Sequence, residues 1–359
     1  MGKLKLYLII AAVFVLTLVG FTSLRSARPI VELKAETVLS LGINITNTMI
    51  TAAIVIIILI VFSYFATRKM SLIPSGIQNF FEMIIEALYN LVVGTAGEKH
   101  ARRFFPVIAT IFLYVVAANW FGLLPGVATI GKVEPLVGEE GVVQEKGTVF
   151  SNVAGVKMIM PGFPSWPPHE PTSITLDVPA DATPQQKEAA AAEATSNLKT
   201  NESAGLLAPF LRSVNTDLNA TLSLAIWSAI FVEFWGISSQ GFFRYGSKFL
   251  NVKRLLKGDI FNGFIDFVVG ILEFVAEAAR LLSFTFRLFG NIFAGEMLFL
   301  VILFLLPIIA LDLVYGLELF FGLIQAFIFA MLTLVFGVVA VTSHEEEGVD
   351  HGSESTVPA

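Results

Sequence analysis

A single cationic residue, Arg287, lies inside a long apolar stretch and strongly constrains what this chain can fold into. The stretch reads Leu281-Leu-Ser-Phe-Thr-Phe-Arg-Leu-Phe-Gly-Asn-Ile-Phe-Ala-Gly-Glu296. An arginine does not lose its proton in a protein, and at the centre of a bilayer helix it costs about 2.5–3.5 kcal/mol on insertion scales. Such a residue needs a polar partner, a hydrated cavity or a functional role.

The composition is that of a membrane protein. The 359 residues are 55% hydrophobic and 14% charged, with a mean hydropathy of +0.77, whereas soluble domains carry about 25% charged residues. The absence of cysteine excludes disulfides, thiolate metal sites and thiol nucleophiles. None of the four histidines falls within an apolar run, so a proton relay in the membrane would use carboxylates, amides, hydroxyls or water. No basic run indicates nucleic acid, and no cofactor motif is present.

Apolar runs and their basic flanks predict how the first half of the chain crosses the membrane. Residues 6–21 are either a short anchor or a signal peptide. Residues 49–66 end in Thr67-Arg-Lys-Met70, which places that end in the cytoplasm by the positive-inside rule. Residues 72–93 have opposite apolar and polar faces at helical spacing, which predicts an amphipathic helix at the cytoplasmic interface. Residues 104–124 then cross outward.

The second half begins with a polar segment, residues 127–215, that we expect to be an external loop without a large core of its own. Residues 222–237 cross back inward and are followed by a basic cluster. Sequence from 261 to 341 is almost continuously apolar, with interruptions around Pro307 and Gly316. The C-terminus is therefore expected in the cytoplasm.

The apolar segment from residue 263 to about 306 contains no proline and is too long for an upright helix. About 40 helical residues reach about 60 Å, twice the roughly 30 Å hydrocarbon core, and normal tilts do not absorb that excess. Either the helix breaks near Gly270 or Gly290, or one helix runs steeply slanted through the membrane. The length favours the slanted helix.

These patterns together predict an all-α polytopic membrane protein with five core membrane helices. An N-terminal anchor or signal segment and an external stretch occupy residues 1–45, and the membrane ion-channel domain is expected at 46–345. An acidic cytoplasmic tail at 346–359 completes the chain.

Polar side chains follow one face of the predicted long helix. Steps of 4, 3, 7 and 4 residues keep five of them in one row, with Ser283 beside it. The row comprises Glu273, Glu277, Arg280, Arg287 and Asn291. Glu318 and Gln325 are seven apart and share a face of the next segment. Glu296 follows Arg287 by nine residues, which turns it to the other side of the helix.

These charges have a structural and a functional interpretation. Glu277 and Arg280, three residues apart, are as well explained by mutual pairing as by function. For Arg287, an ion pair that only held helices together would add little stability once the cost of desolvation is counted. The polar row is therefore better explained as the wall of a hydrated ion path. A secondary transporter would favour internal repeats with broken helices, which we do not find. An assembly scaffold remains an alternative, and no constellation typical of a membrane enzyme lies within the spans.

Three segments resemble subunit a of the F-type ATP synthases over roughly residues 45 to 345. Arg287-Leu-Phe-Gly-Asn-Ile-Phe-Ala-Gly-Glu296 is similar to the hallmark segment of that family. Gln325-Ala-Phe-Ile-Phe-Ala-Met-Leu-Thr333 resembles its last-helix motif, and Asn215-Thr-Asp-Leu-Asn-Ala-Thr-Leu-Ser223 the opening of its third span. The resemblance implies a non-catalytic stator subunit whose two half-channels pass protons or sodium ions to and from the carboxylates of a rotating c-ring. ATP chemistry would belong to other subunits.

The resemblance also implies roles for particular residues. Arg287 matches the arginine that faces the ring carboxylates, and Glu296 matches the relay acid. The other matched polar positions are Glu273, Asn291 and Gln325. Glu318 stands where some bacterial members have histidine, and we expect it to form an acidic relay with Glu296. The N-terminal run and the external loop are longer than in compact members.

The implied setting is a bacterial-type inner membrane, with one copy of the chain in a multisubunit complex. The expected partners are the c-ring oligomer, the b subunits of the peripheral stalk and membrane lipid. No cofactor, metal or nucleic acid is expected.

Overall fold

The computed structural model describes most of the chain between residues 35 and 342. The described residues are 35–40, 44–68, 70, 76–124, 127–136, 146–153, 156–158, 173–176, 183–198, 202–246, 249, 260–305 and 309–342. The predicted N-terminal run at 6–21, the C-terminal tail at 346–359 and most of the basic cluster after the third span lie outside these residues.

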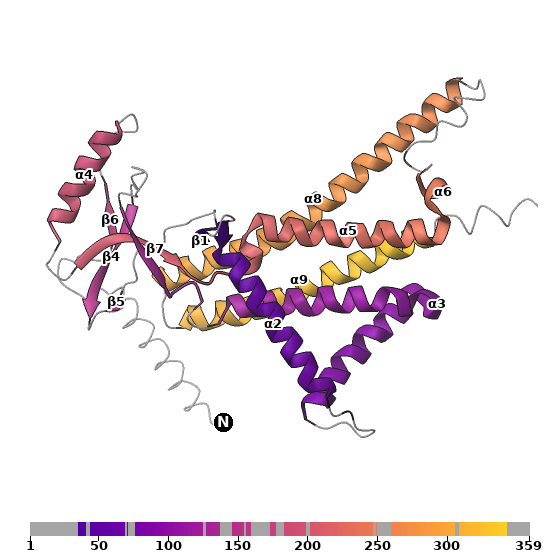
Figure 1. Cartoon of the computed structure of the whole chain (residues 1–359), viewed down its shortest axis with the longest axis horizontal. Helices are drawn as coiled ribbons and strands as arrows, with labels where there is room; N and C mark the ends of the chain where they lie inside the picture. The colour runs from indigo at the N-terminus through magenta and orange to yellow at the C-terminus, as the bar shows by residue number, and fades with distance from the viewer. Residues whose placement is uncertain are drawn as a thin grey trace, which may run out of the picture. The chain divides into compact units, whose positions relative to one another are not determined.

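The described residues form seven α-helices, one short 3-10 helix and seven strands. The helices are α2 (Asn47–Thr67), α3 (Ile77–Gly122), α4 (Pro184–Ser196), η1 (Val214–Thr216), α5 (Leu218–Gln240), α6 (Phe242–Gly246), α8 (Ile260–Leu305) and α9 (Ile309–Thr342) (Figure 1). The strands are β1 (Thr37–Ser40), β2 (Asn44–Thr46), β3 (Gly131–Pro135), β4 (Lys146–Val153), β5 (Val156–Met158), β6 (Ser173–Thr175) and β7 (Glu202–Pro209).

The chain divides into two compact units, and several long helices pass from one unit into the other. Unit 1 comprises Met1–Thr51, Trp120–Val214 and Asn291–Phe321. Unit 2 comprises Ala52–Asn119, Asn215–Gly290 and Gly322–Ala359.

Unit 1 contains an antiparallel sheet built from the segment that was expected to be a loop. The strand order is β3-β7-β4-β5, and β6 also pairs with β4. Helix α4 begins after Thr183, whose backbone N–H donates to the side-chain oxygen of Gln186 at 2.9 Å, one half of a capping box. A small buried cluster joins sheet and helix, made of Leu136, Leu176, Ala191 and Ala204. The polar segment therefore has a modest core of its own.

Unit 2 is a helical assembly around buried aromatic and small residues. The ring centroids of Phe104 on α3 and Trp235 on α5 are 4.3 Å apart, and both residues are fully buried. Gly337 on α9 leaves the space that the Trp235 ring fills, because a Cβ there would come within 2.7 Å of that ring. The hydroxyls of Ser228 and Thr333 join α5 to α9 at 2.8 Å. Close packing of this kind holds helices together in a membrane, where apolar transfer contributes little.

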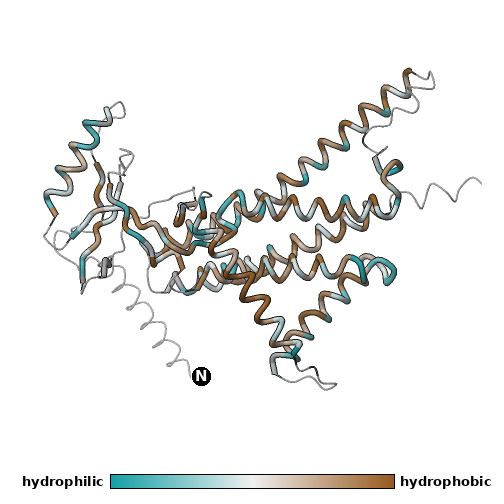
Figure 2. Tube along the Cα trace, in the orientation of Figure 1, coloured by the Kyte–Doolittle hydropathy of each residue, from teal (hydrophilic) through white to brown (hydrophobic). Residues whose placement is uncertain are grey.

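Helix α3 combines two elements that the sequence predicted separately. Gly97 has φ 70° and ψ 160°, a conformation that L side chains rarely adopt, and it divides the segment into two helical arms. Figure 1 shows that α3 bends back on itself. The arm before Gly97 contains the predicted amphipathic helix, and the arm after it contains the span predicted at 104–124. Figure 2 shows hydrophilic residues at the bend and hydrophobic residues along most of α2.

The predicted class, an all-α polytopic membrane protein, is confirmed. Four described helices are long and apolar enough to cross a membrane, at Asn47–Thr67, Gln78–Gly122, Leu218–Gln240 and Asp312–Thr342. Large apolar side chains such as Ile57, Ile60 and Phe65 on α2 face outward, as lipid-facing residues do. The fifth long helix, α8, runs through 46 residues without the break considered at Gly270 or Gly290.

Candidate functional site

The Arg287 side chain lies on an open groove in unit 2. The groove, between α8 and α9, has a volume of about 380 Å³. Its lining residues are Ala276, Ala279, Arg280, Ser283, Phe284, Arg287, Leu332 and Phe336. Ala276, Ala279 and Ser283 have small side chains, so the groove stays open beside Arg287.

Arg287 keeps its charge without a carboxylate partner from the described residues. Its Nη2 donates to the hydroxyl of Ser283, one turn earlier on α8, at 3.3 Å. The guanidinium carbon is 6.0 Å from the ring centroid of Phe284, and the side chain is exposed. The ion pairs Arg212–Glu296 and Arg280–Glu277 involve other arginines. The groove thus presents an uncompensated positive charge.

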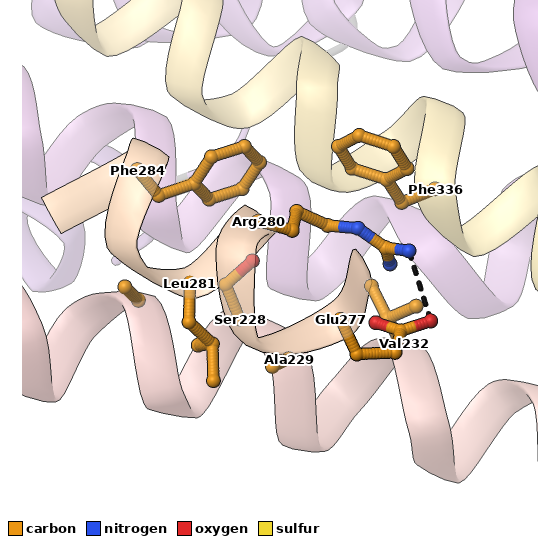
Figure 3. Close-up of a pocket in the computed structure, with 9 residues that line it drawn as sticks. Ser228, Ala229, Val232, Glu277, Arg280, Leu281, Phe284 and Phe336 are labelled. Carbon is orange, nitrogen blue, oxygen red and sulfur yellow. Dashed lines mark hydrogen bonds and ion pairs between the residues drawn. The ribbon is translucent and has the colours of Figure 1, made fainter. Parts of the chain in front are cut away.

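Arg280 lines the same groove but is neutralised within the chain. Its Nη2 lies 2.8 Å from Oε1 of Glu277, and its guanidinium carbon is 4.0 Å from the ring centroid of Phe336. Figure 3 shows this pair beside Ser228 and Val232 of α5, with Phe336 on the other side of the guanidinium. Mutual pairing, one of the two interpretations of Glu277 and Arg280, is therefore present.

Two other predicted polar residues of unit 2 lie further along α8 and α9. Glu273 is half-buried on α8, fourteen residues before Arg287 in the same helical row. Gln325 is half-buried on α9 and forms no hydrogen bond with the described residues.

In unit 1 Glu296 has a partner that sequence reasoning missed. Nη2 of Arg212 is 3.2 Å from Oε2 of Glu296, and the two side chains are 8% and 24% exposed. The backbone N–H of Arg212 donates to the Thr51 hydroxyl at 3.2 Å. The hydrogen-bond partner of Glu296 among the described residues is Arg212, and the expected relay between Glu296 and Glu318 stays a prediction.

Glu318 lies close to the same part of α8 in a different environment. It is 6% exposed, and its carboxylate lies against Gly295, where any Cβ would collide with it. It forms no hydrogen bond or ion pair with the described residues. Nearby on α8, Nδ2 of Asn291 is buried and has no hydrogen-bond partner among them. A buried donor without a partner is a place where water or an ion gains stability.

Two buried asparagines of unit 2 were not among the predicted site residues. Nδ2 of Asn119 donates to the carbonyl of Gly322 at 2.9 Å, and Nδ2 of Asn215 donates to Oδ1 of Asn119 at 2.6 Å. The assignment of amide oxygen and nitrogen follows this network. Asn119 was detectable as an amide inside the apolar run 104–124. Arg212 gave no such signal, because the sequence placed it near the end of an external loop.

Comparisons with known proteins agree with this architecture. The family described as ATP synthase A chain matches residues 47–337. ATP synthase subunit a of Campylobacter jejuni (strain 81-176) is 29% identical over 296 residues, which cover 82% of this chain and 89% of the relative. ATP synthase subunit a of Helicobacter pylori (strain Shi470) is 26% identical over 301 residues, covering 84% and 91%.

The family match spans most of the chain and includes the arginine groove, the Arg212–Glu296 pair and Glu318. The chain therefore belongs to the ATP synthase A chain family, the multi-pass, ion-translocating membrane subunits of the F-type ATP synthase complex.

Proposed function

We propose that this stator subunit supplies two half-channels that pass protons or sodium ions to and from the carboxylates of a rotating c-ring. Arg287 stands between the half-channels and faces the ring. ATP chemistry takes place on other subunits.

The observation that carries this proposal is the free charge of Arg287 in its groove. A guanidinium with no carboxylate from its own described residues, on an open wall of small side chains, is suited to an acidic group on a neighbouring helix. Arg280 shows the contrast, since Glu277 already compensates it.

The charge of Arg287 directs the ion exchange. A ring carboxylate opposite Arg287 is stabilised in its charged form, so it releases its bound ion on one side. It reloads from the other side before it enters lipid, where an unpaired charge is prohibitively unstable. The same charge repels cations and prevents a continuous leak between the half-channels. Each elementary charge that crosses yields about 2.3 kcal/mol per 100 mV, so several are needed for one ATP.

Polar residues on either side of Arg287 line the two half-channels. Glu273 and the half-buried Gln325 serve the path within unit 2, with Ser283 and the Glu277–Arg280 pair supporting that face. Asn291, Glu296 and Glu318 serve the path within unit 1.

The same proposal assigns the parts of the chain to their surroundings. Residues 46–345 form the ion-channel domain in a bacterial-type inner membrane, with the sheet-bearing segment 127–215 outside the cell membrane. Residues 1–45 precede this domain as an anchor or signal segment with an external stretch, and the acidic tail 346–359 is cytoplasmic. One copy assembles with the c-ring, with the b subunits of the peripheral stalk and with lipid.

Disulfide crosslinking in the assembled complex tests the ring contact. The chain has no cysteine, so Ser283→Cys introduces a unique thiol on the groove wall. We expect it to crosslink to a cysteine placed next to the ring carboxylate. Leu282→Cys is the matched control, because residue 282 is 53% exposed but points about 140° away from Arg287 around α8. Crosslinking from position 282 and none from 283 would contradict the proposed orientation.

A further inference from the structure

We propose that Ile130 and Phe210, at the end of the unit 1 sheet beside the first turn of α2, are embedded in the lipid interface and anchor the sheet on the membrane surface. The partner is phospholipid, contacted where the headgroups meet the acyl chains. This lipid contact is separate from the ion path and does not depend on which residues carry the ion.

The first step fixes the depth of the first turn of α2. This helix has 21 residues and no charged side chain. At 1.5 Å per residue it is about 31 Å long, which matches the hydrocarbon core of about 30 Å. Arg68, directly after the helix, is exposed, and its charge belongs at the opposite interface. Because the helix has no length to spare, its first turn lies at the edge of the hydrocarbon and not above the membrane.

The second step ties the segment around Phe210 to that turn. Nδ2 of Asn47 donates to the carbonyl of Pro209 at 3.1 Å, and the backbone N–H of Arg212 donates to the Thr51 hydroxyl at 3.2 Å. Asn47 and Thr51 are one helical turn apart, and both are fully buried. Phe210 lies between the two tied residues of its own strand end. It is therefore held at the depth of the first turn of α2.

The end of α3 reaches the same short segment. A Cβ on Gly122, the last residue of α3, would come within 2.6 Å of the Ser213 side chain, so the helix end packs directly on the chain there. Trp120, in the last turn of α3, is partly exposed and donates from its indole nitrogen to the carbonyl of Leu319 at 3.0 Å. A tryptophan with a satisfied N–H and an outward apolar ring is typical of a membrane interface.

The third step concerns the two side chains themselves. Phe210 is 46% exposed and Ile130 is 66% exposed. The backbone N–H of Phe210 donates to the carbonyl of Ile130 at 3.0 Å, next to the paired residues Gly131 and Pro209, so the two residues lie on neighbouring strands. Single exposed apolar residues are ordinary on a surface in water. At the depth of the first turn of α2 the surroundings are lipid, where the same side chains gain apolar burial.

The polarity of β3 changes in the direction that this placement requires. From Ile130 the strand runs away from the tied segment, since Glu134 pairs with Leu206 further back along β7. Lys132 and Glu134 are both exposed and charged. At about 3.3 Å per residue, Glu134 is roughly 13 Å from Ile130, far enough to leave the interface for water. The apolar contact is thus confined to the end of the sheet beside α2.

Spin labels in the complete ATP synthase measure the depth of these positions. The chain has no cysteine, so Phe210→Cys and Ile130→Cys each give one nitroxide site on this subunit, in a complex whose other subunits carry no reactive cysteine. Met49→Cys, at an exposed position in the first turn of α2, is the lipid reference, and Glu134→Cys is the water control. In liposomes of phosphatidylcholine and phosphatidylglycerol, we expect the ratio of oxygen to Ni–EDDA accessibility at 130 and 210 to approach that at 49. It should be severalfold higher than at 134.

A second measurement needs no substitution. A phosphatidylcholine with a diazirine on its acyl chain is incorporated with the wild-type complex, and light-induced adducts are located by mass spectrometry. We expect adducts on Ile130 and Phe210, as on Met49, and none on Glu134. Copurification of each cysteine variant with the c-ring shows that it has assembled.

Three results would overturn the inference. The first is Ni–EDDA accessibility at either position as high as at 134, which would place that residue in water. The second is protection of both labels from oxygen and from Ni–EDDA, which would show that a protein segment covers them instead of lipid. The third is the absence of lipid adducts from both residues while Met49 is labelled.

Discussion

The guanidinium of Arg280 stacks over the ring of Phe336 with 4.0 Å between the guanidinium carbon and the ring centroid, and this contact joins α8 to α9. Cation–π contacts at this distance contribute about 0.5–2 kcal/mol, depending on how well they are shielded from water. Because Glu277 also binds Arg280, that arginine is fully engaged within the chain. Arg287 lines the same groove and has a long hydrogen bond to Ser283 but no ion pair with the described residues, which leaves its charge available.

Replacing Arg287 by alanine should abolish coupled ATP synthesis while the complex still assembles. The exposed side chain makes few packing contacts, but its charge is the feature that orders ion release and reloading. We expect a loss of at least about 100-fold, typical of removing one preorganised electrostatic group. Synthesis is measured in liposomes, and Arg68→Ala, which removes an exposed arginine directly after α2, is the control. Near-normal coupled synthesis by Arg287→Ala would contradict the mechanism.

The Glu277–Arg280 pair should act on stability more than on transport. A double-mutant cycle of Glu277→Gln, Arg280→Gln and both together should give a coupling energy of about 0.5–3 kcal/mol. The pair is partly buried and its geometry is good, which places it above an ordinary surface ion pair. Thermal unfolding of the purified complex supplies the stabilities, and synthesis rates are measured in parallel. A coupling energy near zero would show that the stacking on Phe336 holds Arg280 without Glu277.

Gly295→Ala should disturb unit 1 because the new Cβ would collide with the Glu318 carboxylate. Because that carboxylate is the end of a flexible side chain, it can move aside at little cost in stability, but its displacement should slow ion passage. Adding Glu318→Ala should relieve the collision without restoring transport. If Gly295→Ala supported ATP synthesis at the wild-type rate, the contact between Gly295 and Glu318 would be wrong.

Trp235→Ala should be among the most destabilising single changes in unit 2. The ring is buried between Phe104 and Gly337, and its removal leaves a large cavity where α3, α5 and α9 meet. Such truncations cost about 3–5 kcal/mol. Trp227→Ala, also on α5 but 59% exposed, should change stability by only about 0.5 kcal/mol. Thermal unfolding of the two variants gives the comparison, and equal losses would argue against the packing described for α5.

Much of the helical fold was predictable because a bilayer imposes simple rules. The length of the apolar run alone located α2: the run predicted a span at 49–66, and the observed helix is Asn47–Thr67. The length argument also predicted α8 as one long helix, since no proline interrupts it. The polar row on α8 followed from helical spacing once the segment was known to be helical. The segment 127–215 was less predictable, because its strands are short and pair across long separations, as Thr148 does with Gly205.

In the candidate site, too, contacts between residues close in sequence were predictable, and contacts between distant segments were not. Arg287 and its Ser283 neighbour are one turn apart, so local periodicity placed them together. Glu277 and Arg280 were likewise paired by spacing. Arg212 was missed because 84 positions of sequence separate it from Glu296, with η1, α5, α6 and most of α8 between them. The contact of Glu318 with Gly295 was missed because helical spacing gives no register between two separate helices.

The sequence by itself determined that the chain enters a membrane as long helices and carries a permanent charge within one of them. Those properties depend on hydropathy and on the helical repeat, which are local. Only the tertiary structure decided which acids are already neutralised and which remain available. Electrostatic pairing depends on distances of a few ångströms between segments far apart in sequence. That is why Glu296 pairs with Arg212, whereas Glu318 lies against Gly295 without an ion pair among the described residues.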